Sequence, residues 1–218
     1  MTAILSNSSF TTPLRASATS ANLPLLARLS ARVSCSLDEV AVFASPQAAF
    51  AAIASGIALG RGTVALSGTH ETTLDALIAA ARDAAVVTLQ SPLLQGGRVV
   101  TALTPRELLL LRSRAPRPIL VLDLLNEELA RTPLTQPALL LPATIIVRGF
   151  GELWREAGAT TLAELAFVVG PRELVASLEA PELNASTVAR ACEELDVPEI
   201  DRAVRAAAFG REALENCA

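Results

Sequence analysis

Short aliphatic runs that alternate with helical segments constrain the fold of this chain most. Runs of four or five mostly apolar residues recur at 40–43, 63–66, 85–89, 119–122, 144–147 and 166–169. Segments with helical spacing or helix-start signals lie between and around them, at 23–33, 47–59, 71–82, from 104 onward and at 172–179. Short apolar strands separated by helices are typical of a parallel sheet that is covered on both faces. We therefore predict an α/β fold of three layers, α/β/α, with a mostly parallel sheet.

Cap residues mark the start of two of the predicted helices. Ser45 is a good N-cap, and Pro46 after it suits the first helical position. Thr104 precedes Glu107 by three residues, which is the spacing of a capping box. The stretch 91–97, which contains Pro92 and two glycines, is predicted as a loop. Gly60 and Gly62 are predicted to end the helix that Ser45 and Pro46 begin.

The length of 218 residues suits one domain with short additions. Ser186 can cap a helix near the end of the chain, and Pro198 can open another that runs through 208. Residues 1–34 contain no acid and many Ser, Thr, Asn and Ala residues. A loose arm and an export or transit signal both fit that composition. We predict three parts: a flexible N-terminal arm (1–22), a main domain (23–180) and a helical tail (181–218).

Composition argues against several classes of partner. The net charge is −4 and the arginines are scattered among acids, so we expect no nucleic-acid binding. Cys35, Cys192 and Cys217 are widely spaced and His70 is the only histidine, so a metal site is not expected. An odd number of cysteines favours a reducing compartment, and we predict a cytoplasmic protein. No apolar run reaches the roughly 20 residues of a membrane span.

The chain contains no lysine, and all 18 of its basic residues are arginines. A lysine Schiff base is therefore impossible for this chain alone. A genome rich in G and C would also shift lysine codons toward arginine, and the many Ala, Arg and Leu residues fit that explanation. No Gly-x-Gly-x-x-Gly follows a predicted strand and no P-loop is present, so the sequence does not indicate a nucleotide site.

Four patches in order resemble motifs of the fold-type I pyridoxal-phosphate enzymes. The similarity is to class I/II aminotransferases, especially the histidinol-phosphate aminotransferase and threonine-phosphate decarboxylase group, and it covers about 23–178. The loop N-P-x-N-P-T-G and the following T-P-E-E-L are similar to 91–108, and the strand ending D-E-A-Y is similar to 119–126. The patterns V-x-S-F-S-K-x-[WY] and G-Y-x-V-x-P-x-E-L are similar to 145–154 and 167–174.

The resemblance implies which residues would contact the cofactor. Asp123 takes the place of the acid that holds the pyridinium nitrogen, where the protonated ring acts as electron sink. The same aspartate could instead cap the turn that follows its strand. Leu94 replaces the asparagine that binds the ring oxygen, and Asn126 replaces the tyrosine of D-E-A-Y. Glu152 stands where the family has its Schiff-base lysine.

The family's phosphate ligands are changed as well. Gly149 and Gly151 replace two serines, and Thr160 replaces an arginine. Ser45 falls at the family's phosphate-binding helix start, where Pro46 removes one backbone donor. His70 falls near the aromatic residue that stacks on the ring, although a solvated histidine in a turn is the alternative. The degenerate set that remains is Asp123, His70 and Ser45.

The resemblance therefore implies an aminotransferase-like protein without covalently bound pyridoxal phosphate. We expect a non-catalytic role in binding or assembly, as a homodimer or as the partner of an active aminotransferase-like paralogue. The family's small domain, with its substrate lid, is not expected. Two alternatives stay open. One is a residual pyridoxal-phosphate enzyme, or an enzyme using Glu152 and Asp123 as an acid–base pair. The other is an exported interaction protein.

Overall fold

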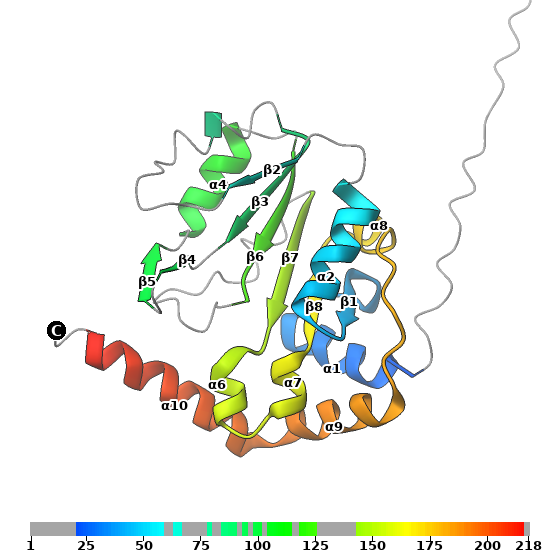
Figure 1. The fold of residues 1–218 in the computed structure, drawn as a ribbon, viewed down its shortest axis with the longest axis vertical. Helices are drawn as coiled ribbons and strands as arrows, with labels where there is room; N and C mark the ends of the chain where they lie inside the picture. Colours follow the sequence, from blue (N-terminus) through cyan, green and yellow to red (C-terminus); the bar gives the residue numbers. More distant parts are fainter. Residues whose placement is uncertain are drawn as a thin grey trace, which may run out of the picture.

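A mixed α/β architecture is seen in the computed structural model (Figure 1). The structure describes most of the chain with several gaps. The described residues are 21–58, 63–66, 78–79, 84–90, 93–95, 98–101, 104–114, 118–125 and 143–215. Gly60, Gly62, His70, Asn126, Cys217 and the first 20 residues lie outside them. Of the helix predicted over 71–82, only residues 78 and 79 are described, and they are helical.

Six strands form one sheet in the order β1-β8-β7-β6-β3-β2. Strands β2, β3, β6 and β7 pair parallel with one another, whereas β8 pairs antiparallel with both β7 and β1. Strand β1 therefore runs in the same direction as β6 and β7. The mostly parallel sheet predicted from the sequence is confirmed. The strands are β1 (Val40–Phe43), β2 (Thr63–Leu66), β3 (Val86–Gln90), β6 (Ile119–Asp123), β7 (Thr144–Gly149) and β8 (Ala166–Val169).

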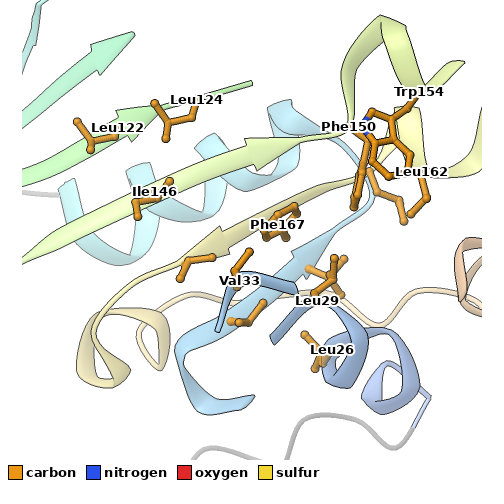
Figure 2. Close-up of a cluster of buried hydrophobic side chains, with 14 of the residues drawn as sticks. Leu26, Leu29, Val33, Leu122, Leu124, Ile146, Phe150, Trp154, Leu162 and Phe167 are labelled. Carbon is orange, nitrogen blue, oxygen red and sulfur yellow. The ribbon is translucent and has the colours of Figure 1, made fainter. Parts of the chain in front are cut away.

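Alternate residues of the strands enter two separate hydrophobic clusters, one on each face of the sheet. On β6, for example, Leu120 and Leu122 belong to the first cluster and Val121 to the second. A strand points successive side chains to opposite faces, so an unbroken apolar run gives two buried faces. This is the physical basis of the three layers. Figure 2 shows part of the first cluster, with Leu122, Leu124 and Ile146 on the sheet side.

Helices cover both faces of the sheet. The second cluster lies under α2 and the short α8, whereas the first cluster lies under α1, α4, α6, α7, α9 and α10. A π-helical turn, η2 (Ala54–Ala58), follows α2, so the helix predicted over 47–59 ends earlier in its α-helical form. The helices are α1 (Leu23–Val33), α2 (Pro46–Ile53), α4 (Pro105–Arg114), α6 (Gly151–Glu156), α7 (Thr160–Glu164), α8 (Arg172–Val175), α9 (Ala185–Asp196) and α10 (Pro198–Glu215).

Hydrogen bonds at the helix starts agree with the caps predicted at Ser45 and Thr104. The Ala48 N–H donates to Ser45 Oγ at 3.2 Å, so the Ser45 cap is confirmed. The Thr104 N–H donates to Glu107 Oε2 at 2.8 Å, and the Glu107 N–H donates to Thr104 Oγ1 at 3.2 Å. Both halves of the capping box are therefore present.

Two local predictions were wrong. The stretch 91–97 is not a simple loop, because β4 (Leu93–Gln95) pairs antiparallel with β5 (Arg98–Thr101). Ser186 is not the cap of α9 either. Asn184 Oδ1 accepts from the Thr187 N–H at 2.7 Å, and Ser186 Oγ lies 2.7 Å from that same oxygen.

The tail helices pack on the main domain. Val188, Ala191, Cys192 and Val204 belong to the first cluster, so the tail shares its hydrophobic core. Figure 1 shows α9 and α10 below the sheet, next to α1, α6 and α7. Among the described residues, no helix combines the length and apolarity that crossing a membrane requires. Within the same residues, no three His, Cys, Asp or Glu side chains gather closely enough to bind a metal ion.

Candidate functional site

The carboxyl ends of β1, β6 and β7 lie at one edge of the sheet. Because the three strands run in the same direction, the segments after them meet at this edge. Open α/β sheets bind their ligands outside the carboxyl ends of strands. We call this region the carboxyl edge and define it by Ser45, Asp123, Leu125 and residues 149–152. It therefore contains Ser45, Asp123, Gly149, Gly151 and Glu152, whereas Leu94 and Thr160, the other described positions that the resemblance assigns to the cofactor site, lie outside this definition.

Asp123 is the last residue of β6 and pairs with Val147 of β7. The Leu124 N–H donates to the Val147 carbonyl at 2.9 Å, so the two strand ends stay joined beyond Asp123. Asp123 Oδ1 accepts a hydrogen bond from the Leu125 N–H at 3.1 Å. Burial raises the pKa of this carboxyl, and the hydrogen bond from Leu125 opposes that rise in part. The turn-capping alternative for Asp123 is thus present in the structure.

Glu152 lies in the first turn of α6, three residues after β7 ends. Its side chain is 63% exposed, and Oε2 lies 3.8 Å from Nη1 of Arg155 one turn along the helix. An acid in the first turn of a helix is favoured by the helix dipole, whatever else it does. The residues after it, Leu153 and Trp154, are buried and hold the helix on the core. The residue at the lysine position therefore behaves as a surface acid.

The two glycines that replace serines have different reasons for being glycine. Gly151 adopts a φ of +59°, a conformation that residues with a side chain rarely adopt. Gly149 does not adopt such a φ. A Cβ atom placed on it would lie 3.0 Å from Cδ2 of Leu125, too close for an ordinary contact. The space next to Gly149 is therefore taken by a side chain from the neighbouring strand end.

Ser45 follows β1 and is half-buried. Its hydroxyl accepts from the Ala48 N–H and thereby caps α2. Because the next residue is Pro46, the helix start lacks one of its usual backbone donors. Thr160 is exposed at the start of α7, and Leu94 lies in β4, opposite Val99.

Sequence reasoning missed two features that shape this region. The first is Leu125, whose proximity to Gly149 depends on strand register. A signal was available, because the D-E-A-Y pattern has alanine where this chain has Leu125. The second is an aromatic group that anchors α6. The rings of Phe150 and Trp154 lie 5.0 Å apart edge to face, and Phe167 lies 5.6 Å from Phe150 (Figure 2).

Several solved structures share this arrangement of sheet and helices. Histidinol-phosphate aminotransferase from Sinorhizobium meliloti, solved in complex with pyridoxal 5′-phosphate, superposes with a TM-score of 0.66 and 18% identity over 84% of this chain and 57% of that one. L-threonine-O-3-phosphate decarboxylase from Porphyromonas gingivalis gives 0.59 and 19%, over 83% and 65%. Aspartate aminotransferase from Thermus thermophilus gives 0.63 and 15%, over 90% and 59%. The chain has an aminotransferase-like fold.

The aminotransferase-like fold confirms the architecture that the four patches implied. The identities are too low to carry function, and the chain spans 57–66% of the length of the first four structures. No protein-family model matches the sequence. No curated protein matches it either. The geometry agrees with the resemblance on one decisive point, since the strand end at Asp123 lies beside the strand that leads to Glu152.

Proposed function

We propose that this chain is a non-catalytic aminotransferase-like protein whose scaffold serves binding or assembly. One observation carries the proposal. At the position of the family's lysine, on the turn beside the Asp123 strand end, the chain has Glu152, which is exposed and lies near Arg155. The whole chain has no lysine that could replace it from another position. Covalent attachment of the cofactor and the proton transfers of a lysine amine are therefore absent from the proposed role.

The remaining residues of the carboxyl edge fit pyridoxal phosphate poorly. Glu152 would bring a negative charge toward an anionic cofactor, where an ammonium group would have attracted it. Gly149 and Gly151 offer no hydroxyl, and the Ser45 hydroxyl already accepts the N–H that begins α2. Asp123 alone keeps both its place and its acid. We propose that the chain holds no resident cofactor.

The proposed partner is a second aminotransferase-like chain, either another copy of this protein or an active paralogue. The resemblance supports this choice, because proteins of this fold dimerise through the large domain. We propose a cytoplasmic location on the chemistry of the thiols. Cys35 and Cys192 are unpaired, and burial raises the pKa of both, that of Cys35 to about 11. Such thiols react slowly and suit a reducing compartment.

Single-lysine variants test the lost chemistry in a background that has no other lysine. Glu152→Lys restores the amine at the family's position, and Glu164→Lys places a matched amine on the exposed side of α7. Each variant is incubated with pyridoxal phosphate, reduced with borohydride and analysed by mass spectrometry. We expect the same low labelling of both lysines. Preferential stoichiometric labelling of residue 152, abolished by Asp123→Asn, would instead indicate a working cofactor site and a residual enzyme.

Light scattering on the purified full chain tests assembly. We expect the mass of a dimer for the chain alone, or of a one-to-one complex when an aminotransferase paralogue from the same source is added. A monomer that forms no complex with such a paralogue would contradict the proposed partner. If residues 1–34 direct a fused reporter out of the cytoplasm, the exported alternative replaces the cytoplasmic one.

A further inference from the structure

Leu125 and Gly149 form a contact between two neighbouring strand ends at the carboxyl edge. Asp123 of β6 pairs with Val147 of β7. Leu125 and Gly149 each follow that pair by two residues, so they lie side by side. A Cβ atom on Gly149 would be 3.0 Å from Leu125 Cδ2 and 3.7 Å from the Leu165 carbonyl oxygen. Since Gly149 lacks a left-handed φ, space alone, and not backbone strain, disfavours a side chain there.

The position of Leu125 is fixed from two sides. Its N–H donates to Asp123 Oδ1, which holds the turn after β6. Its half-buried side chain packs against the second hydrophobic cluster, as do Ala48 and Phe50 of α2. A side chain at position 149 would require Leu125 to shift by a few tenths of an ångström, and the contact of Leu125 with that cluster resists the shift.

We infer that Leu125 occupies the space of the ligating side chain that the family places at position 149, so that apolar packing closes the carboxyl edge. This inference rests on the proposed loss of the cofactor site, and it names the packing contact that takes the place of a cofactor ligand. The Glu152 side chain is 63% exposed, whereas Leu125 Cδ2 lies 3.0 Å from the position that a Cβ on Gly149 would take. Restoring a lysine and a serine would therefore not be enough to rebuild a phosphate-binding edge while Leu125 remains.

A double-mutant cycle on thermal unfolding tests the contact. Gly149→Ser in the wild-type background should lower Tm by about 3–8 °C, the size expected when a small core group is overpacked in a chain of this length. In the Leu125→Ala background the same change should lower Tm by less than half of that amount. Equal losses in both backgrounds would overturn the inference. Gly149→Ala provides a milder version of the same comparison.

Gly170→Ser is the matched control. A Cβ atom at Gly170 would lie 3.1 Å from the Thr144 carbonyl oxygen and 3.2 Å from Ile145 Cγ1, with Leu125 not among its near neighbours. Its effect should be the same in the wild-type and Leu125→Ala backgrounds. If Gly149→Ser does not fold, cooperative unfolding regained by adding Leu125→Ala supports the contact. A double variant that stays unfolded while Leu125→Ala alone folds contradicts it.

The result that would reject the Leu125 contact differs from the result that would reject the proposed function. Uncoupled Tm losses together with no cofactor binding would remove Leu125 from the explanation and leave the non-catalytic role intact. Saturable pyridoxal-phosphate binding by the wild-type chain would instead reject the proposed function, whatever the coupling between the two positions.

Discussion

In two regions of this molecule, the pKa values of aspartates are shifted in opposite directions. At the carboxyl edge, burial raises the pKa of Asp123, which accepts a backbone N–H from Leu125. The tail helices are joined to the main domain by what we call the tail latch, the contacts of α9 and α10 with α1 and α7. In the latch, hydrogen bonds from Arg28 and Arg32 lower the pKa values of Asp196 and Asp201. The latch acids therefore favour folding when ionised, whereas ionised Asp123 opposes it.

The tail latch also contains a buried carboxylate that caps the start of α7. Glu194 of α9 accepts from the Thr161 N–H at 3.1 Å and from the Leu162 N–H at 2.8 Å. These are among the first backbone donors of α7, which have no partner inside that helix. These latch acids thus have partners within the chain. For Asp123, by contrast, the effect of burial on the pKa exceeds that of the Leu125 hydrogen bond.

The largest effect should follow from removing the aromatic anchor between α6 and α1. Trp154 is buried, contacts Phe150 edge to face, and has the Arg32 guanidinium 4.9 Å from its ring centre. Trp154→Ala should lower the free energy of unfolding by about 3–5 kcal/mol, measured by urea denaturation. Trp154→Phe, which keeps much of the apolar volume, should cost clearly less. A loss below about 1 kcal/mol for alanine would show that the packing of α6 on α1 does not depend on this ring.

The next effect should come from the carboxylate that caps α7. Glu194→Ala leaves the N–H groups of Thr161 and Leu162 without their acceptor, and we expect a loss of about 2–4 kcal/mol. Glu194→Gln keeps one oxygen and should lose roughly half as much. Urea unfolding of the three proteins at one pH measures both. If glutamine and alanine are equally harmful, the charge rather than the hydrogen bonds stabilises α7.

Acid should weaken the latch through Asp201. Its pKa is lowered in the folded chain, chiefly by the hydrogen bond from Arg32, and Arg205 adds to this. The stability from Asp201 is therefore present above its ordinary value of 3.8 and lost as pH falls through the lower folded pKa. Asp201→Asn should remove about 0.5–1 kcal/mol at pH 7 and nothing at a pH below both values. A constant difference across that range would argue against the ion pairs.

The smallest effect is expected at Asp123, and with the opposite sign. Its pKa is raised from 3.8, so the cost of ionising Asp123 in the folded chain grows as the pH rises above 3.8 and is complete above the folded pKa. Asn at this position keeps an oxygen for the Leu125 N–H and removes the buried charge. Asp123→Asn should raise stability at pH 7 by less than about 1 kcal/mol, and the gain should vanish below pH 3.8. Destabilisation at pH 7 alone would mean that the charge has a favourable partner.

Local signals were enough to predict much of the fold. Ser45 and Thr104 were correctly identified as caps because their partners lie three residues away in sequence. Ser186 was predicted as the cap of the helix near 186, but Asn184, two residues earlier and an equally good cap, takes that place. The strand–helix alternation predicted the layers, since each apolar run supplies both faces of the sheet.

The candidate site was less predictable, because it depends on contacts across the sheet. The motif order placed Asp123 near Glu152, and the pairing of β6 with β7 agrees. That Leu125 lies against Gly149 required the register between those strands. The Glu194 cap joins residues more than 30 positions apart, so no local pattern indicated it.

Titration of the wild-type chain with pyridoxal phosphate, followed by its absorption spectrum and by borohydride reduction, tests the central claim most directly. The chain contains no lysine, so the N-terminus is the amine available for reduction. A dismantled cofactor site predicts the spectrum of the free cofactor at every concentration and no saturable binding. A saturable, stoichiometric spectral change that is lost in Asp123→Asn would contradict it.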